Sequence, residues 1–445
     1  MERSVLPRFL PAAVLAAAAL AGCATYSPAP LSEGADRILA VPSARSGVID
    51  LNAPLTPRAL AAIAVIANPD LKAARAQAGV VEAQLFAAGL LPDPSFNFSY
   101  DGRISGPDPF NGLGAQLIYD LVALRDRDVV LAGARAAREQ ARLDLAWREW
   151  QTAGQARLLA ARIAGLAVAA PLLDASRLVS SDALDRAMRS GSAGDLKADD
   201  LTARRLAAAD AAERARQAAR DLATARNDLN GLLGLPPRTV LDIMSDPQPK
   251  QQPAESTALF ERARLNRLDL KALEAGYRSQ EAAVRKAARD GFPSLQLTLS
   301  HTRDTADNKT FGPSVNFTLP VWNRNQGGVA QAKATRAQLQ AEYAARLFAT
   351  RSQIADLAAG LSIDQGRRVD LAAHVRPLDA AASAAEAAAA RGDISRAAAE
   401  AARQIATDRR VALIALDQSI AEQAVALELA VGAPLESAAT GAPAP

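Results

Sequence analysis

The chain contains few of the residue types on which catalytic and metal-binding sites depend. Its 445 residues include one cysteine, two histidines and three methionines, and aromatic side chains make up only 4%. A single cysteine cannot form a disulfide within the chain. No glycine-rich phosphate loop, metal-ligand spacing or nucleophile elbow is present. These absences argue against an enzyme, and we expect no cofactor and no resident metal.

The low aromatic content and abundant alanine disfavour a thick globular core and favour long, closely packed helices. The formal net charge is +3, and this small excess is spread along the chain, so nucleic acid is not an expected partner. Beyond the N-terminal segment no uncharged apolar run reaches about 18 residues. The best candidate, 163–173, is too short and contains Pro171. We therefore expect no transmembrane helix in the mature protein.

The N-terminal segment resembles a bacterial lipoprotein signal. Arg3 and Arg8 form a basic start, an apolar run follows, and the signal (1–22) ends immediately before Cys23 in the sequence Leu-Ala-Gly-Cys. The cysteine of such a signal is acylated and becomes the mature N-terminus. Ala24 stands where an aspartate resembles an inner-membrane retention signal, so the outer membrane is favoured. The alternative is an ordinary signal peptide that happens to contain a cysteine. Residues 23–52 then form a lipid-anchored tether.

The rest of the chain is predicted to be a tandem duplication. A shift of 198 residues places Gly312 on Gly114 (312 − 114 = 198), and similar shifts superpose Asp-Leu-Lys-Ala at 269–272 on the same letters at 70–73. We predict two repeats, 53–235 and 256–434, each with a helix, a β-hairpin and two long helices. A proline-rich linker, 236–255, joins the repeats, and 435–445 form a disordered tail.

Strict alternation of apolar and polar residues predicts the two hairpins, at 94–122 and 293–320. One face of the strands is apolar and is expected to contact lipid: Phe96, Phe98, Tyr100, Leu117, Tyr119, Leu121, Leu295, Leu297, Leu299, Val315, Phe317 and Leu319. The other face is polar and is expected to line a lumen: Ser95, Asn97, Ser99, Ser294, Gln296, Thr298, Asn316 and Thr318.

The long helices are expected to turn back near Pro171 and Pro377, because proline interrupts a helix. A shorter helix, about 57–90, precedes the first hairpin, with a break possible at Asn68-Pro69. Gly-Asp pairs recur at 194–195 and 392–393. We expect them to mark interruptions within the second long helices, with Asp195 and Asp393 as N-caps. A metal site around the acidic residues that follow Asp195 is an alternative, although no histidine or cysteine lies nearby.

Four strands are too few to close a barrel of useful width, and an open sheet leaves backbone groups unpaired in lipid. The number of strands in one chain therefore predicts an oligomer, and a homotrimer would supply 12 strands around a water-filled lumen. Trp322, just after the last strand, suits the periplasmic edge of the membrane. The alternative is a soluble hairpin packed on a helical bundle, which would leave the aromatic side chains exposed.

The chain resembles the TolC family of outer membrane efflux proteins over nearly all of its mature length. The most specific parts are Asn-Pro-Asp-Leu at 68–71, Leu-Pro-Asp-Pro at 91–94, Leu-Pro-Val-Trp-Asn-Arg-Asn-Gln-Gly at 319–327, and Gly432 after the last helix. The run at 319–327 looks most like the branch that serves heavy-metal pumps of the resistance-nodulation-division (RND) type. The resemblance implies a mainly α fold with a membrane β-barrel portion: a homotrimer with a 12-stranded barrel and a 12-helix tunnel.

The resemblance also implies a passive exit duct that opens by untwisting of its helix tips. An inner-membrane RND pump and a periplasmic adaptor would dock there. Charged gate residues of relatives correspond to Asp174, Asp182, Asp364, Arg367, Arg368 and Asp370, although a solvated helix face explains them equally well. Heavy-metal cations are the expected cargo, and drug efflux or type I protein secretion is the alternative. A periplasmic coiled-coil lipoprotein without a pore is the alternative from another class.

Overall fold

The computed structural model describes residues 27–29, 31, 51, 53–102, 104–193, 195–244 and 255–435. The chain divides into two units, Met1–Ala40 and Val41–Pro445, and all elements named below belong to the second. The expected signal peptide, Cys23, most of the tether, the second half of the linker and nearly all of the tail lie outside the described residues.

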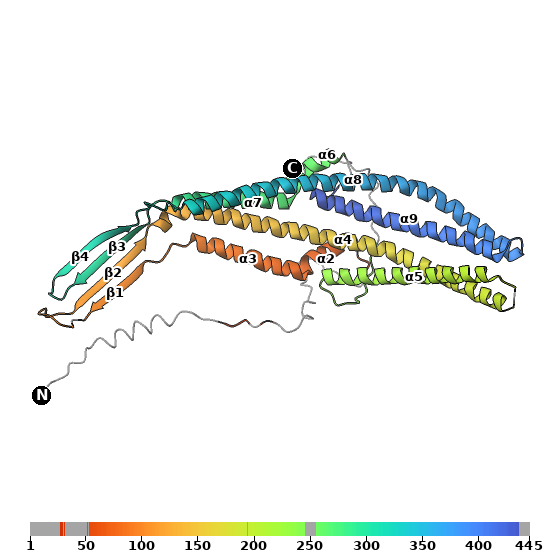
Figure 1. Cartoon of the computed structure of the whole chain (residues 1–445), viewed down its shortest axis with the longest axis horizontal. Helices are drawn as coiled ribbons and strands as arrows, with labels where there is room; N and C mark the ends of the chain where they lie inside the picture. Colours follow the sequence, from red (N-terminus) through yellow and green to blue (C-terminus); the bar gives the residue numbers. More distant parts are fainter. Residues whose placement is uncertain are drawn as a thin grey trace, which may run out of the picture. The chain divides into compact units, whose positions relative to one another are not determined.

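The two halves of the chain have the same order of elements (Figure 1). The first half comprises α2 (Pro57–Ala67), α3 (Pro69–Gly89), β1 (Ser95–Asp101), β2 (Gly112–Asp120), α4 (Val122–Ser192) and α5 (Ala198–Leu232). The second half comprises α6 (Ser256–Asn266), α7 (Leu268–Arg289), β3 (Leu295–Arg303), β4 (Lys309–Phe317), α8 (Gln326–Arg391) and α9 (Arg396–Val431). The predicted duplication and the mainly α fold are therefore confirmed.

The break at Asn68 is also confirmed. Its side-chain oxygen accepts a hydrogen bond from the Leu71 backbone N–H at 2.9 Å, which caps α3. Pro69 occupies the first position of that helix, where its missing N–H has no cost. Asn68 thus ends α2 and starts α3 in a single residue.

The expected turns at Pro171 and Pro377 are wrong. α4 has 71 residues and contains Pro171, and α8 has 66 residues and contains Pro377. One interior proline costs a helix about 3 kcal/mol, and packing against several neighbouring helices along the remaining length outweighs this. The chain instead reverses between the end of α4 at Ser192 and the start of α5 at Ala198, and between the end of α8 at Arg391 and the start of α9 at Arg396.

The predicted caps at these turns are wrong as well. Lys197 and Ser395 are the N-cap residues of α5 and α9, and the Ser395 hydroxyl accepts from the Ala398 N–H. Asp393 instead accepts a hydrogen bond from Arg391 at 2.9 Å. The Gly-Asp repeats therefore mark the reversal of each helical hairpin and not an interruption within its second helix.

The four strands form one antiparallel sheet in the order β1-β2-β3-β4. Their ends differ from the prediction by a few residues. Leu121 is not a strand residue, because it is the N-cap of α4, although its N–H still donates to the Leu295 carbonyl. Ser294, Thr318 and Leu319 also lie just outside the strands. The Ser294 and Thr318 hydroxyls lie 2.7 Å apart and prolong the pairing.

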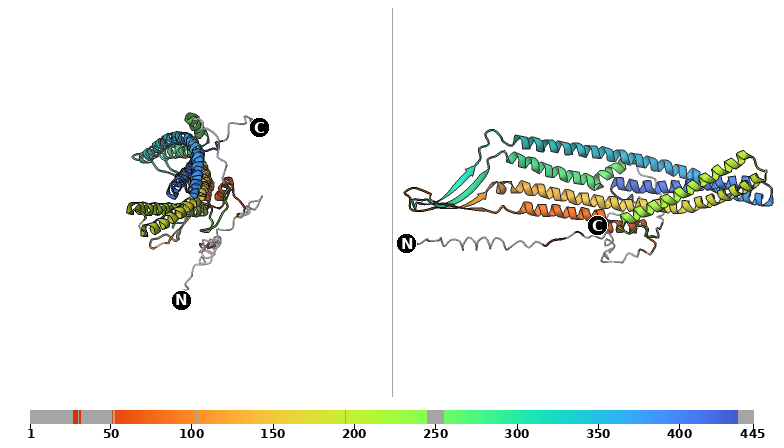
Figure 2. Two further views of the ribbon diagram at one scale, coloured as in Figure 1. Left: turned by 90° about the vertical axis from the view of Figure 1, so that its right-hand side faces the viewer. Right: turned by 60° about the horizontal axis from the view of Figure 1, so that its bottom comes forward.

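The helices share two apolar clusters, one in each half. Leu159 and Ile163 lie in the first with α2 and α5, and Ile354 and Leu361 lie in the second with α6 and α9. α4 contacts α5, α7 and α9, so it joins the two halves (Figure 2). Most of the buried hydrophobic residues outside these clusters are alanines, which allow the helix axes to approach closely.

The expectation that the mature protein has no transmembrane helix stays a prediction, although α4 passes a test of length and composition. One 18-residue stretch of it has a mean hydropathy of 1.7, which is long and apolar enough on length and composition alone. The run-length criterion missed it because isolated charged residues interrupt the run. Only 17% of this stretch is buried within the protomer.

Candidate functional site

The register of the sheet separates its side chains into an apolar and a polar face. Phe96 pairs with Leu117, Leu117 with Leu299, and Leu297 with Val315. Cross-strand partners point to the same side of a sheet, so these residues share one face. The partners of the other face are Asn97 with Gln116, Gln116 with Ser300, and Gln296 with Asn316.

The apolar face is uncovered in a single protomer. Its large apolar side chains are between 38% and 71% exposed, except for Tyr119, which is partly buried. On the polar face Ile118, which pairs with Thr298, is the one large apolar residue within the strands, and the alternation rule did not single it out. Which face meets lipid and which lines a lumen stays a prediction.

The outer strands of the sheet have one unpaired edge each. β1 pairs only with β2 and β4 only with β3 within the described residues. An exposed row of backbone N–H and C=O groups is a template for another strand. Both edges of the sheet are therefore open to pairing with a further strand.

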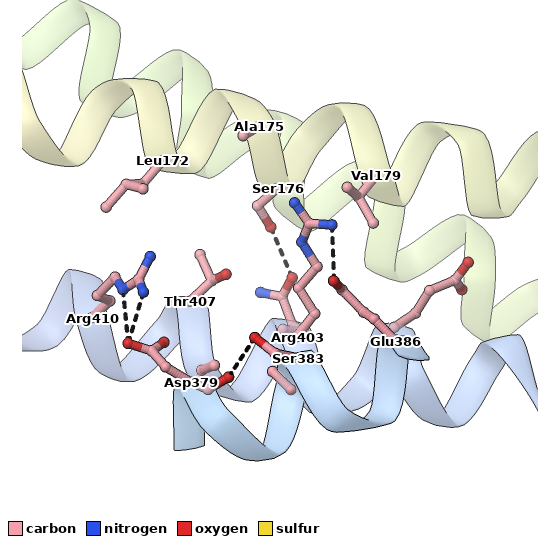
Figure 3. Close-up of a pocket in the computed structure, with 14 residues that line it drawn as sticks. Leu172, Ala175, Ser176, Val179, Asp379, Ser383, Glu386, Arg403, Thr407 and Arg410 are labelled. Atoms are coloured by element: carbon pink, nitrogen blue, oxygen red, sulfur yellow. Dashed lines mark hydrogen bonds and ion pairs between the residues drawn. The ribbon is translucent and has the colours of Figure 1, made fainter. Parts of the chain in front are cut away.

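Near the far end of the helices, α4 packs against the α8–α9 hairpin around a polar cavity of about 230 Å³ (Figure 3). The Ser176 hydroxyl donates to the Gln404 side chain at 2.8 Å across this contact. Within the α8–α9 hairpin, Arg403 pairs with Glu386 and Arg410 with Asp379. The charged groups that line the cavity are therefore neutralised in pairs.

Glu400 of α9 is the residue that connects the two helical hairpins close to their turns. Its carboxylate pairs with Arg186 of α4 and with Arg204 of α5, and its side chain is only 18% exposed. A second cavity of about 290 Å³ lies beside it and is lined by Asp182, Arg186 and Arg403 among others. Sequence reasoning missed Glu400 because the turns had been placed at the prolines.

Most of the predicted gate residues do not lie at the helix tips. Asp370, the nearest of the four on α8, precedes the end of that helix by 21 residues (391 − 370 = 21), which is about 30 Å. Asp364 accepts from Gln423 at 2.7 Å and pairs with Arg367, while Arg368 pairs with Asp417. Asp174 pairs with Arg177 of its own helix. Of the six residues only Asp182 lines a cavity near the turns.

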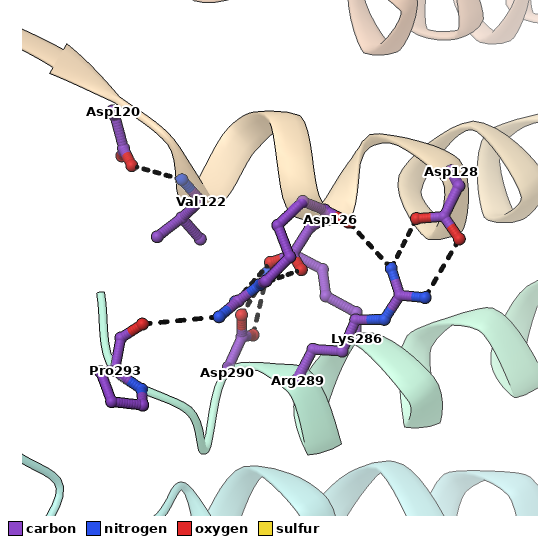
Figure 4. A network of polar contacts seen from close by, with 9 residues as sticks. Asp120, Val122, Asp126, Asp128, Lys286, Arg289, Asp290 and Pro293 are labelled. Carbon is purple, nitrogen blue, oxygen red and sulfur yellow. Dashed lines mark hydrogen bonds and ion pairs between the residues drawn. The ribbon is translucent and has the colours of Figure 1, made fainter. Parts of the chain in front are cut away.

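At the other end of the helices a polar network joins the sheet to α4 and α7 (Figure 4). Arg125 forms a bidentate pair with Asp126, which is 2% exposed, at 2.8 and 3.0 Å. Hydrogen bonds from Arg125 hold the pKa of Asp126 below its ordinary value. Arg289 of α7 donates to the Arg125 carbonyl and to Asp128. These contacts hold the end of α7 against the start of α4, next to the sheet.

No group of three or more His, Cys, Asp or Glu side chains in the described part of the chain is arranged to hold a metal ion. The acidic residues after Asp195 fall in the first turn of α5, where Asp199 and Asp200 complement the helix dipole.

Residues 259–433 match the sequence profile of the family described as "Outer membrane efflux protein". This match covers most of the second repeat, which therefore resembles the family. The description of the family names an efflux protein of the outer membrane.

Solved structures share the whole fold at low sequence identity. The CmeC outer membrane channel of Campylobacter jejuni has a TM-score of 0.68 and 17% identity, covering 92% of this chain and 93% of that one. CusC has a TM-score of 0.66 and 17% identity, covering 88% and 95%. The outer membrane protein VceC of Vibrio cholerae has a TM-score of 0.66 and 16% identity, covering 85% and 97%. No curated protein matches the sequence.

Proposed function

We propose that three copies of the chain form one efflux duct. Each copy contributes four strands to a closed 12-stranded barrel, and the long helices continue it as a 12-helix tunnel through the periplasm. The β1 edge of one copy pairs with the β4 edge of the next, which removes every unpaired edge from the lipid. Such a head-to-tail contact closes into a ring when the rotation per subunit is one third of a turn.

The observation that carries this proposal is the register-defined apolar face, exposed along a sheet whose two edges are both open. The exposed apolar stretch of α4 supports it, because neighbouring copies would cover that surface in the proposed assembly. The test is conductance of the purified, detergent-solubilised protein in planar bilayers. A heat-sensitive trimer that forms channels supports the duct, whereas a monomer without conductance favours a structural coiled-coil lipoprotein.

The proposed cargo is heavy-metal cations, on the basis of the 319–327 run. The duct itself supplies no energy, so the proposal assigns selection to an RND pump in the inner membrane. A deletion strain should lose resistance to cations when it is grown on panels of metals and hydrophobic drugs. Loss of drug resistance alone would favour the drug-efflux alternative, and loss of a secreted protein would favour type I secretion.

The proposed docking region for the adaptor and pump is the pair of turns at 193–197 and 392–395. In the closed state Glu400 would hold the α8–α9 hairpin on α4 and α5 through its two arginine partners. Release of these pairs would let the hairpins separate and the duct open.

Acylation of Cys23 is proposed as a second anchor beside the barrel. Labelling of cells with radioactive palmitate tests it directly. Label in the wild-type chain and none in Cys23→Ser supports the lipid anchor, and equal label in both chains contradicts it.

A further inference from the structure

The strands sort their charged side chains by sign between the two faces. The strands contain five residues of the Asp, His, Arg and Lys types: Asp101, Asp120, His301, Arg303 and Lys309. The register places both aspartates on the polar face and all three basic residues on the apolar face. Sequence alternation alone did not draw attention to this separation.

The basic residues lie at one end of the apolar face. Arg303 is the last residue of β3, Lys309 is the first of β4, and the two pair directly opposite each other. This is the loop end of the sheet, because every strand joins a helix at its other end. In the proposed barrel the loop end faces the outside, so the basic pair lies level with the headgroups of the outer leaflet. A charged side chain is tolerated on the lipid face only near such an interface.

Two like charges directly opposite each other destabilise a sheet. Arg303 is partly compensated, since it pairs with Asp307 at 2.6 Å and its guanidinium lies 4.4 Å from the centre of the Phe110 ring. The ammonium group of Lys309 has no ion-pair partner among the described residues. The nearby Asp304 accepts three hydrogen bonds within the loop, and Asp108 accepts one from Thr305.

Aromatic side chains flank the basic pair on the same face. The rings of His301 and Phe311 lie 6.5 Å apart, and Phe311 and Tyr100 are largely exposed. Aromatic rings at this level are typical of a membrane–water interface. Below them, the leucines of β3 continue the apolar face towards the helices. The surface therefore offers cations for a headgroup, rings at the boundary and a surface for acyl chains.

We propose that Lys309 and Arg303, with His301 beside them, bind the phosphate groups of a phosphorylated glycolipid of the outer leaflet, such as lipid A of lipopolysaccharide. The inference rests on the proposed barrel and adds a specific lipid partner to it. Phosphate relieves the repulsion within the Arg303–Lys309 pair by charge-assisted hydrogen bonds. The acyl chains would lie along the apolar face below.

The test measures binding of lipid A to the full-length channel in detergent, with dephosphorylated lipid A as the comparison probe. Lys309→Gln should weaken binding of lipid A by about fivefold, and the double variant with Arg303→Gln by about 25-fold. Lys333→Gln is the matched control, since it removes the same charge from an exposed position on α8. It should leave binding unchanged, and the wild type should bind the dephosphorylated probe as weakly as the double variant binds lipid A.

Conductance of the same preparations separates this proposal from the channel itself. The lipid site alone would be overturned if the trimer conducts and the substitutions leave its affinity for lipid A unchanged. It would also be overturned if the conducting trimer binds the dephosphorylated probe as tightly as lipid A. A wild-type preparation with neither trimer nor conductance would overturn the barrel and the lipid site with it. Variants that conduct normally but have lost lipid A binding support the proposal.

Discussion

Asn68 and Arg267 occupy equivalent positions in the two repeats and fasten equivalent helices with different chemistry. The Asn68 amide donates to the Leu232 carbonyl at 2.9 Å, and the Arg267 guanidinium donates to the Ala430 carbonyl, also at 2.9 Å. The positions differ by one repeat length (267 − 68 = 199; 430 − 232 = 198). Arg267 does more than Asn68, because it also pairs with Asp269 and lies 4.7 Å from the ring centre of Trp147 on α4. It therefore links the second repeat to the first.

Arg267→Ala should destabilise the protein by about 3–5 kcal/mol, because it leaves the carboxylate of Asp269 buried without its partner. Asn68→Ala should cost about 1–2 kcal/mol, the usual value for an N-cap. Unfolding of the two solubilised variants in denaturant gives midpoint concentrations that measure these losses of stability. The double variant Arg267→Ala/Asp269→Ala should recover part of the loss, and equal effects of the two single variants would contradict the role of the buried ion pair.

Asp126 should make the protein sensitive to acid. Hydrogen bonds from Arg125 lower its folded pKa below the ordinary value of 3.8. Its contribution to stability is therefore complete above pH 3.8 and disappears as the pH falls through the lower folded value. Asp126→Asn should lower the melting temperature at pH 7 and make the change in melting temperature below pH 4 smaller. A variant with the wild-type acid response would show that other groups cause it.

Asp144 on α4 should have the opposite effect. Burial raises its pKa, and the negative charge of Asp269 adds to this while Arg148 opposes it. A raised folded pKa means that ionisation costs stability, so the penalty is absent at low pH and grows as the pH rises through that value. Asp144→Asn should raise the melting temperature at pH 7 and leave it unchanged near pH 3. A loss of stability at pH 7 would contradict this.

Glu400→Gln should loosen the closed duct. The substitution removes the charge that Arg186 and Arg204 share, so single-channel recordings should show a severalfold higher open probability. Glu386→Gln is the matched control, since its partner Arg403 belongs to the same helical hairpin and the pair does not cross to α4. Equal open probabilities of the two variants, or no increase in either, would contradict the role of Glu400 in keeping the duct closed.

Adjacent residues of β4 should respond differently to a charge. Val315→Arg places a charge on the apolar face, two residues before the end of β4. A charge on the lipid face costs about 2–4 kcal/mol at the membrane midplane and less towards the interface. Ser314→Arg places the same charge on the polar face. We expect little trimer in outer membranes for Val315→Arg and normal trimer with altered conductance for Ser314→Arg. The reverse pattern would exchange the two faces.

Local pattern predicted the sheet well because alternation reports directly which side chains share a face. Gln296 and Asn316, which lie on different strands, were predicted on the same polar face, and the register pairs them directly. The prediction of where β2 ends was less accurate, since Leu121 suits a strand and a helix start equally. The Asp120 side chain decides between them, because it accepts a hydrogen bond from the Val122 N–H.

The helix tips were misplaced because a proline is a local signal and helix packing is not. Pro171 interrupts one hydrogen bond of α4, while contacts with α9 on both sides of it hold the helix straight enough to continue. The repeated Gly-Asp pairs were the better guide, since a turn of a duplicated fold recurs at the repeat length. Glu400 could have been found by asking which charges flank those pairs.

The central claim is that the four-stranded sheet of one chain is one third of a shared barrel. The mass of the detergent-solubilised protein, measured by native mass spectrometry, tests it most directly. The account predicts a complex of three protomer masses in which the backbone amides of β1 and β4 are protected from hydrogen exchange. A single protomer mass, with the amides of both edge strands exchanging freely, would contradict it.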